Sequence, residues 1–223
     1  MNRRTVGGVL AGLAALMLVM WGTPVRAQPK VVQDIPMPPG LYDRVEEEGW
    51  VRFLRNMPLM PRGSKVLYRD GRPKRYQDGH VAVVNLDVMR FQQCSDSILR
   101  LRAEWLWGGG VRDSRRITRE IGMGVVRWRG RTRKQFDRYL NRVFVRTGTL
   151  NMDRGLHRSR HQPRVGDALV WGGSPGHAVL IVDVVQDPQG GWRLMMGQGW
   201  TPAQQFHIMR HLHGSEPSAW WSD

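Results

Sequence analysis

The spacing of apolar residues changes part-way along this chain, and that change limits the folds the chain can adopt. Before Val165 the apolar residues recur mostly at helical spacing, whereas after it short apolar runs alternate with Gly- and Pro-rich turns. The strands expected in this second part are 168–171, 178–185, 192–196 and 206–209. A chain in which helices come first and strands joined by short turns come second is typical of an α+β fold with an antiparallel sheet.

Three segments of the first part are expected to be helical. They are 42–55, which has acidic residues near its start, a helix that begins at Cys94 and ends at a Gly-Gly-Gly run, and an amphipathic helix around 136–144. A short apolar run at 81–88 is expected to be a strand. The basic stretch 111–134 has few periodic apolar residues, so we expect an insertion or loop over the sheet.

The first 27 residues have the composition of a secretory signal peptide. Arg3 and Arg4 precede an apolar run from Val9 to Trp21, and Val25-Arg26-Ala27 has the small-x-small pattern of a cleavage site. The apolar run is short for a membrane span, and an uncleaved anchor is the alternative to a cleaved signal. We therefore expect export to a bacterial periplasm or beyond, with no stable membrane span after the signal is cleaved.

The remaining chain is long enough for one domain with a sizeable core. Residues 28–40 are rich in proline and are expected to be an extended N-terminal arm, and 41–223 are expected to be a single domain.

The chain is strongly basic, with 34 Lys and Arg against 19 Asp and Glu. Removal of the signal peptide leaves a net charge of about +12. The run from Arg127 to Lys134 alternates arginine with an aromatic residue, as nucleic-acid binders do. Export instead makes the anionic polymers of the cell envelope, including peptidoglycan, the expected partners, and nucleic acid is not expected. A solvated basic face that keeps the protein soluble explains the charge equally well.

Cys94 is the only cysteine, and it stands where the second expected helix begins. A thiol at a helix N-terminus lies at the positive end of the helix dipole, which favours the nucleophilic thiolate. Exported proteins usually pair their cysteines, and this cysteine has no partner within the chain. The alternative interpretation is a small buried residue that packs as an apolar group.

A thiolate that catalyses acyl transfer needs an imidazole to take its proton and a polar group to orient that imidazole. His177 opens a strand after a Gly-Gly-Ser-Pro-Gly turn, and Gln198 ends the next strand. We therefore expect these two residues to form a catalytic site with Cys94. Gln204 competes with Gln198 for the third place, and His80, which also precedes a strand, is an alternative base.

Two tryptophans flank the expected histidine in sequence. Trp171 and Trp200 are expected to shape an apolar groove for the substrate, and Gln204 is the third expected substrate-binding residue. Asp183 shares the alternation face of His177 but lies about 20 Å further along the strand, so it is not expected in the site. Asp167 is expected to cap a turn.

Two groups of histidines have spacings that zinc sites use. They are His157 and His161, and His207, His211 and His213. Arginines surround both groups and no carboxylate lies near them in sequence, so no metal and no cofactor are expected.

Four stretches carry a resemblance to known families: FLRNMPLMPRGS, QQCSDSILRLRAEWLW, GDALVWGGSPGHAVLIVDVV and TPAQQFHIM. Over Trp50 to Trp221 the chain is similar to an uncharacterised bacterial family, the domain of unknown function 4846. The order of its cysteine, histidine and polar residue, with Gly166-Asp167 opening the strand before the histidine, also resembles NlpC-type papain-like peptidases and amidases. Gln93 precedes the cysteine where that family commonly has aspartate, and the cysteine-to-histidine spacing is long.

The resemblance implies a papain-like fold in which the cysteine-bearing helix packs on an antiparallel sheet. It also implies an exported cysteine peptidase or amidase that forms a thioester, most economically on an amide bond of cell-wall peptidoglycan. A thiol hydrolase that acts on acyl or lipid substrates is the alternative within this chemistry. A non-catalytic, basic envelope-binding protein is the alternative from another class.

Overall fold

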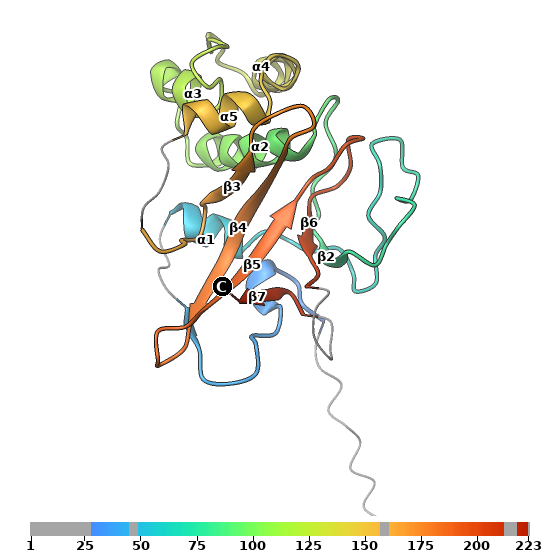
Figure 1. Ribbon diagram of the computed structural model, residues 1–223. Helices are drawn as coiled ribbons and strands as arrows, with labels where there is room; N and C mark the ends of the chain where they lie inside the picture. The colour runs from blue at the N-terminus through green and yellow to red at the C-terminus, as the bar shows by residue number, and fades with distance from the viewer. Residues whose placement is uncertain (1–27, 45–48, 157–160, 212–217, 223) are drawn as a thin grey trace, which may run out of the picture.

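A computed structural model of the protein describes residues 28–44, 49–156, 161–211 and 218–222. A twisted antiparallel sheet forms one layer, and most of the helices gather at one end of it, with α2 nearest to the strands (Figure 1). The α+β class and the antiparallel sheet are therefore confirmed. The expected signal peptide lies outside the described residues.

Within the described residues, seven strands form one sheet, and every pairing between them is antiparallel. The central path runs β1-β4-β5-β6-β2, while β3 pairs with β4 and β7 pairs with β5. The strands are β1 (Asp43–Arg44), β2 (His80–Val83), β3 (Ala168–Trp171), β4 (His177–Gln186), β5 (Trp192–Gln198), β6 (His207–Met209) and β7 (Trp220–Ser222). The strands expected after Val165 are confirmed, with bounds that shift by a residue or two.

The helices match the apolar periodicity in two clear cases. The helix α2 begins at Cys94 and α4 carries the amphipathic stripe, as predicted. The helices are η1 (Val32–Asp34, a 3-10 turn), α1 (Trp50–Arg55), α2 (Cys94–Gly108), α3 (Ser114–Glu120), α4 (Arg133–Arg146) and α5 (Thr149–Gly155). Among the described residues, none of these helices combines the length and the apolar character that a bilayer crossing requires.

The prediction of a helix over 42–55 is wrong for its first part. Asp43 and Arg44 form β1 against the end of β4, and the helix α1 begins only at Trp50. A buried partner explains the difference, because the Arg44 guanidinium donates to Asp183 Oδ2 of β4 at 2.9 Å. The acidic residues 46–48 lie outside the described part of the chain.

Two further predictions differ from the structure. The basic stretch 111–134 is not a loop over the sheet, because it contains α3 and buries Ile117, Ile121 and Trp128 in the helical layer. Its arginines cover the outer face, which hid the inward apolar residues from a periodicity analysis. The arm 28–40 is not extended throughout, since η1 places Val32 in the core, where Ile35 is also buried.

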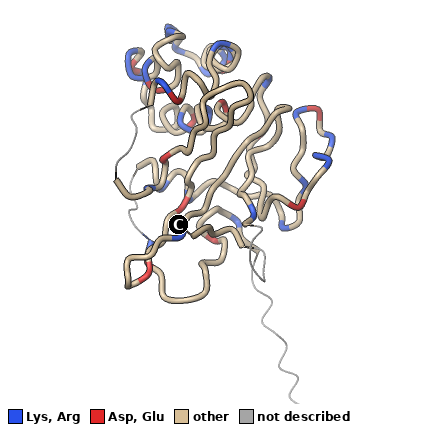
Figure 2. The backbone as a smooth tube through the Cα atoms, viewed as in Figure 1, with Lys and Arg blue, Asp and Glu red and all other residues tan. Residues whose placement is uncertain are grey.

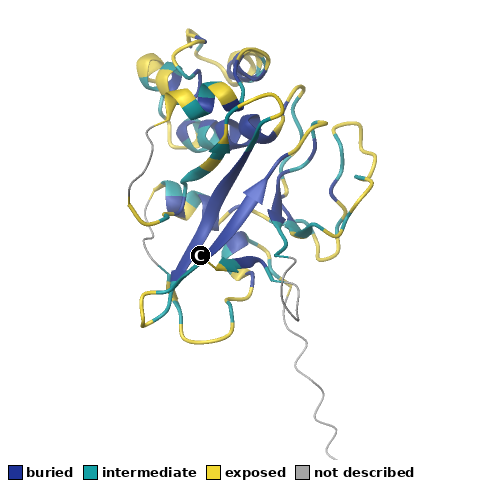
Figure 3. Cartoon of the chain, in the orientation of Figure 1, coloured by how far each residue is buried: buried dark blue, intermediate teal, exposed yellow. Residues whose placement is uncertain are grey.

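The core lies between the sheet and the helices. Residues 178–185 of β4 are all buried, and α2 contributes a continuous set of buried residues opposite them (Figure 3). Lys and Arg are spread over the outside, notably on α3, α4 and the loop between α1 and β2 (Figure 2). Arg55 and Arg100 are exceptions, because their side chains are buried.

Asp183 is a charge buried in the middle of β4, with no exposed side-chain surface. Its Oδ1 accepts from Arg55 Nε at 2.7 Å and its Oδ2 accepts from Arg44 Nε at 2.9 Å. This carboxylate ties α1 and β1 to the sheet. Asp183 is therefore a structural residue, in agreement with its exclusion from the site.

We expect Asp183→Asn to lower the free energy of unfolding by about 3 kcal/mol, because the buried ion pairs that this carboxylate forms with Arg55 and Arg44 would both lose their negative charge. Urea denaturation followed by circular dichroism measures the change. Asp70→Asn is the matched control, since its ion pair with Arg72 is exposed and its loss should change stability little. Equal effects of the two substitutions would contradict the structural role given to Asp183.

Candidate active site

Cys94 is the first residue of α2, and its side chain is almost fully buried, with 6% of the residue exposed. Gln93, at the N-cap position, donates its backbone N–H to Asp96 Oδ2 at 2.9 Å. The Ser97 hydroxyl donates to the Gln93 carbonyl at 2.7 Å. These bonds hold the first turn of the helix, whose leading N–H groups have no acceptor within the helix itself.

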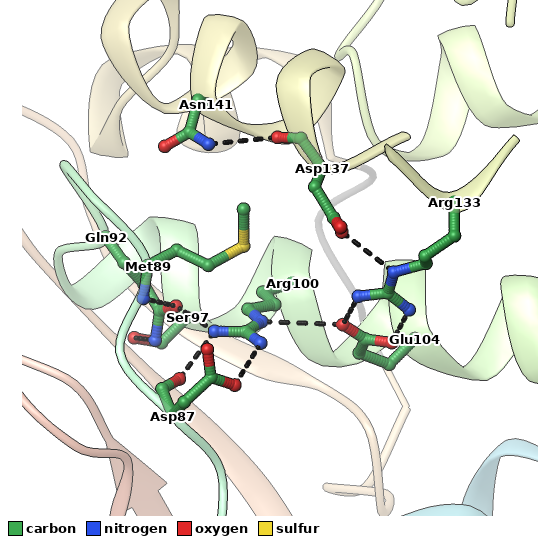
Figure 4. A network of polar contacts seen from close by, with 9 residues as sticks. All are labelled: Asp87, Met89, Gln92, Ser97, Arg100, Glu104, Arg133, Asp137 and Asn141. Carbon is green, nitrogen blue, oxygen red and sulfur yellow. Dashed lines mark hydrogen bonds and ion pairs between the residues drawn. The ribbon is translucent and has the colours of Figure 1, made fainter. Parts of the chain in front are cut away.

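A buried arginine anchors the approach to this turn (Figure 4). Arg100, one and a half turns along α2, donates to Asp87 Oδ1 at 2.8 Å and to Gln92 Oε1 at 3.0 Å. The Gln92 amide nitrogen donates in turn to Ser97 Oγ at 3.2 Å. The residues that precede Cys94 are thus bonded to the body of the helix that follows it.

The same network reaches the helix α4 (Figure 4). Glu104 of α2 forms an ion pair with Arg100 and accepts two hydrogen bonds of 2.6 Å from Arg133, at the start of α4. Helices α2 and α4 are therefore linked on the side of α2 that bears the arginine.

The end of β5 lies directly against the first turn of α2. A Cβ atom added to Gly199 would lie 2.1 Å from Ser97 Oγ and 3.1 Å from the Gln93 carbonyl oxygen. A side chain at this position would force the strand and the helix apart. Gly199 therefore allows the residue before it, Gln198, to lie close to the cysteine-bearing turn.

His177 and Gln198 are in direct contact. His177 is the first residue of β4 and Gln198 the last residue of β5, on neighbouring antiparallel strands. His177 Nε2 lies 2.8 Å from Gln198 Oε1. Of the two glutamines that compete for the third position, Gln198 is thus the one bonded to the histidine.

A second histidine, His207 on β6, fixes the direction of these hydrogen bonds. Its Nδ1 lies 3.0 Å from the carbonyl oxygen of Gln205, which only accepts, so Nδ1 carries the proton. Complete burial lowers the pKa of His207 to about 4, with the Gln205 contact opposing this shift, so the ring is neutral at pH 7 and its Nε2 is an acceptor.

The directions of the other two hydrogen-bond contacts follow from this acceptor. The Gln198 amide nitrogen lies 3.4 Å from His207 Nε2 and donates to it, so Gln198 presents its oxygen to His177. His177 must then carry its proton on Nε2, which leaves Nδ1 with a free lone pair. The arrangement therefore prepares Nδ1 of His177 to accept a proton.

Cys94 and His177 line one cleft of about 820 Å³. Its walls include both expected tryptophans: Trp171 lies directly opposite His177 across the β3–β4 pairing, and the Trp200 ring centroid is 4.2 Å from that of His177. The described lining residues are 93–96, 147–150, 171, 173–177, 200 and 201. A smaller cavity of about 270 Å³, near Trp192, has no nucleophile among its described lining residues.

Two of the expected residues lie elsewhere. Gln204 is buried in a bridge with Tyr68 and is not among the described residues that line the cleft, so the structure does not place it with the substrate. His80 Nε2 lies 3.1 Å from the Ser64 carbonyl oxygen, and its ring faces His207 at 6.0 Å. His80 is likewise absent from the described lining of the cleft.

His207 was considered in the sequence only as a metal ligand. The signal that identifies it is the strand register, in which His207 lies opposite Gln198. In the part of the chain that the structure describes, no group of three or more His, Cys, Asp and Glu side chains could hold a metal ion. His157 and His213 lie outside that part.

Asp96 is the third ionisable side chain of the cleft, beside Cys94 and His177. Only 2% of the residue is exposed, and burial raises its pKa from 3.8 to about 7, opposed by the hydrogen bond from Gln93. Within the described structure its Oδ1 atom is buried and has no hydrogen-bond partner. Sequence reasoning did not identify this residue, because its burial depends on the surrounding loops.

Comparison with known proteins gives a family and no activity. The model of the family described as domain of unknown function (4846) matches residues 31–125 and 125–223. No curated protein and no solved structure matches the chain.

We expect long-range proton–nitrogen NMR spectra at neutral pH to show His177 protonated at Nε2 and His207 protonated at Nδ1. His207→Leu should remove the acceptor that orients Gln198, so His177 should become a mixture of tautomers. His161→Leu, an exposed control, should leave the His177 tautomer unchanged. A His177 ring protonated at Nδ1 in the unaltered protein would contradict the deduced chain of bonds.

The raised pKa of Asp96 also predicts that the free energy of unfolding depends on pH. The pKa of Asp96 is higher in the folded than in the unfolded protein, so the protonated carboxyl group stabilises the fold fully below pH 3.8. This contribution is lost as the pH rises toward about 7. Asp96→Asn keeps an oxygen acceptor for Gln93, so we expect its stability relative to the unaltered protein to improve by about 3 kcal/mol between pH 4 and pH 8. Urea denaturation across this range measures the difference. Asp78→Asn, an exposed control, should show a constant difference, and a constant difference for Asp96→Asn would contradict the prediction.

Proposed function

The chain belongs to the domain of unknown function 4846 family, and we propose that it is an exported cysteine hydrolase that cleaves an amide bond. One observation carries the proposal: Cys94 and His177 line the same cleft, and Gln198 holds the histidine with Nδ1 free. A nucleophile, a base and a group that orients the base are the three parts that thiol acyl transfer requires.

The proposed reaction begins with transfer of the Cys94 Sγ proton to His177 Nδ1. The thiolate attacks the substrate carbonyl carbon, so that a carbon–sulfur bond forms while the carbonyl oxygen takes the electron pair. Collapse of this intermediate breaks the carbon–nitrogen bond, and the His177 imidazolium gives its proton to the leaving amine. Gln198 Oε1 stays bonded to Nε2–H throughout and stabilises the charged ring without taking its proton.

The second half of the reaction hydrolyses the thioester. His177 takes a proton from water, the resulting hydroxide adds to the thioester carbon, and the carbon–sulfur bond breaks to release the acid and restore Cys94. In both halves the backbone N–H of Cys94, in the first turn of α2, is the proposed donor to the oxyanion. The positive end of the helix favours the same negative charge.

The finer parts of the proposal are a papain-like fold and a cell-wall substrate. A cysteine at the start of a helix that packs on an antiparallel sheet supports the NlpC-type arrangement. The net charge of about +12 that remains after signal cleavage supports attraction to an anionic envelope polymer, and the signal-like N-terminus supports export to it. An amide bond of peptidoglycan is therefore the substrate that we propose.

The test is hydrolysis of purified peptidoglycan fragments by the protein recovered from its native export route, with products identified by mass spectrometry. We expect Cys94→Ser and His177→Gln each to lower the rate by about 10²-fold or more, because each removes a part of the proton-transfer step. His80→Gln is the matched control and should retain the rate, since His80 does not line the cleft.

Two outcomes contradict the proposal. One is hydrolysis that survives both cleft substitutions. The other is an absence of hydrolysis together with wall binding that is released by salt and is unchanged by Cys94→Ser, which would identify a basic envelope-binding protein.

A further inference from the structure

The cleft differs in charge from the rest of the molecule. The chain carries a net charge of +15, yet no Lys or Arg is among the described residues that line the cleft. Asp96 is the one carboxyl group among those residues. A basic protein thus presents an acidic group, and no fixed positive charge, at the place where the proposed chemistry occurs.

The two oxygens of Asp96 differ in their surroundings. Oδ2 accepts the Gln93 N–H at 2.9 Å, and this bond fixes the orientation of the carboxyl group in the first turn of α2. Oδ1 is buried, and the described residues offer it no donor. A buried acceptor without a donor destabilises the folded protein, and an ionised one does so more strongly. The site therefore lacks one donor for Asp96 Oδ1.

We propose that this donor comes from the substrate, as a primary ammonium group, so that the cleft takes amides with a free amine close to the cleaved carbonyl. Asp96 stands two residues after Cys94 in the first turn of α2, and both residues line the cleft. The identity of the cleaved bond rests on the proposed function, whereas the ammonium site depends only on Asp96 and the cleft.

Two other features fit an ammonium ligand. Trp171 is 77% exposed and Trp200 is 44% exposed, and both rings line the cleft, where their faces attract a cation. No Lys or Arg is among the described residues that line the cleft, and burial raises the pKa of Asp96 to about 7. A bound ammonium would supply that missing charge and lower the pKa again.

The first test uses three small probes and the Cys94→Ala protein, in which no bond can be cleaved by the thiol. Alaninamide carries the free amine, lactamide replaces the amine with a hydroxyl group, and N-acetylalaninamide blocks it. At pH 7.5 we expect calorimetry to show alaninamide binding at least about tenfold more tightly than either other probe, as for a charge-assisted hydrogen bond. Equal affinities, or no binding of any probe, would overturn the inference.

The second test removes the carboxyl group. Asp96→Asn in the Cys94→Ala background should abolish the preference for alaninamide, after circular dichroism has shown that the variant is folded. Asp78→Asn removes one negative charge from an exposed position and should keep the preference. A preference that persists in Asp96→Asn would overturn the inference.

The inference and the proposed function fail in different ways. With cleavable anilides of alanine and lactic acid, equal cleavage of both by the unaltered protein would overturn the ammonium site and leave the hydrolase in place. Selective binding of alaninamide without cleavage of any amide would support the ammonium site and contradict the hydrolase.

Discussion

The site depends on the contact between the end of β5 and the first turn of α2. Gly199 lies so close to Ser97 that no side chain fits between the strand and the helix. The Ser97 hydroxyl is itself bonded to Gln93 and Gln92, so the strand packs against a turn whose polar groups are already paired. Because Gln198 directly precedes this glycine, the contact sets the position of Gln198, and through it that of His177, relative to Cys94.

Behind this contact, a single backbone carbonyl sets the direction of three side-chain groups. The Gln205 carbonyl accepts from His207, His207 accepts from Gln198, and Gln198 accepts from His177. Burial keeps His207 neutral, so the direction does not reverse near neutral pH. An amide placed between two imidazoles can thus assign a tautomer without placing a charge beside His177.

The elements that could be predicted from the sequence are those that apolar spacing and turn residues determine locally. The start of α2 at Cys94, the stripe of α4 and the strands after Val165 follow from apolar spacing and turn residues. The two-residue strand β1 could not be predicted in this way, because its pairing with β4 and the hydrogen bond from Arg44 to Asp183 stabilise it. The prediction of a loop around α3 was also wrong, since arginines on one face of the segment hid the apolar residues on the other.

The candidate site could be predicted only in part for a similar reason. The positions of Cys94, His177 and Gln198 at the ends of elements were visible in the sequence. The contribution of His207 depends on strand register, and that of Asp96 depends on burial, neither of which a single sequence reveals. Gln204, which was expected to bind the substrate, is instead buried and forms a bridge with Tyr68.

Alkylation of the Cys94 thiol tests directly whether His177 activates it, without knowledge of the substrate. The measurement is the rate of iodoacetamide reaction at Cys94 at pH 6, in the unaltered protein and in His177→Ala. We expect removal of His177 to slow alkylation at least about tenfold, because less thiolate is present without the imidazole. Equal rates in the two proteins would show that His177 does not activate Cys94.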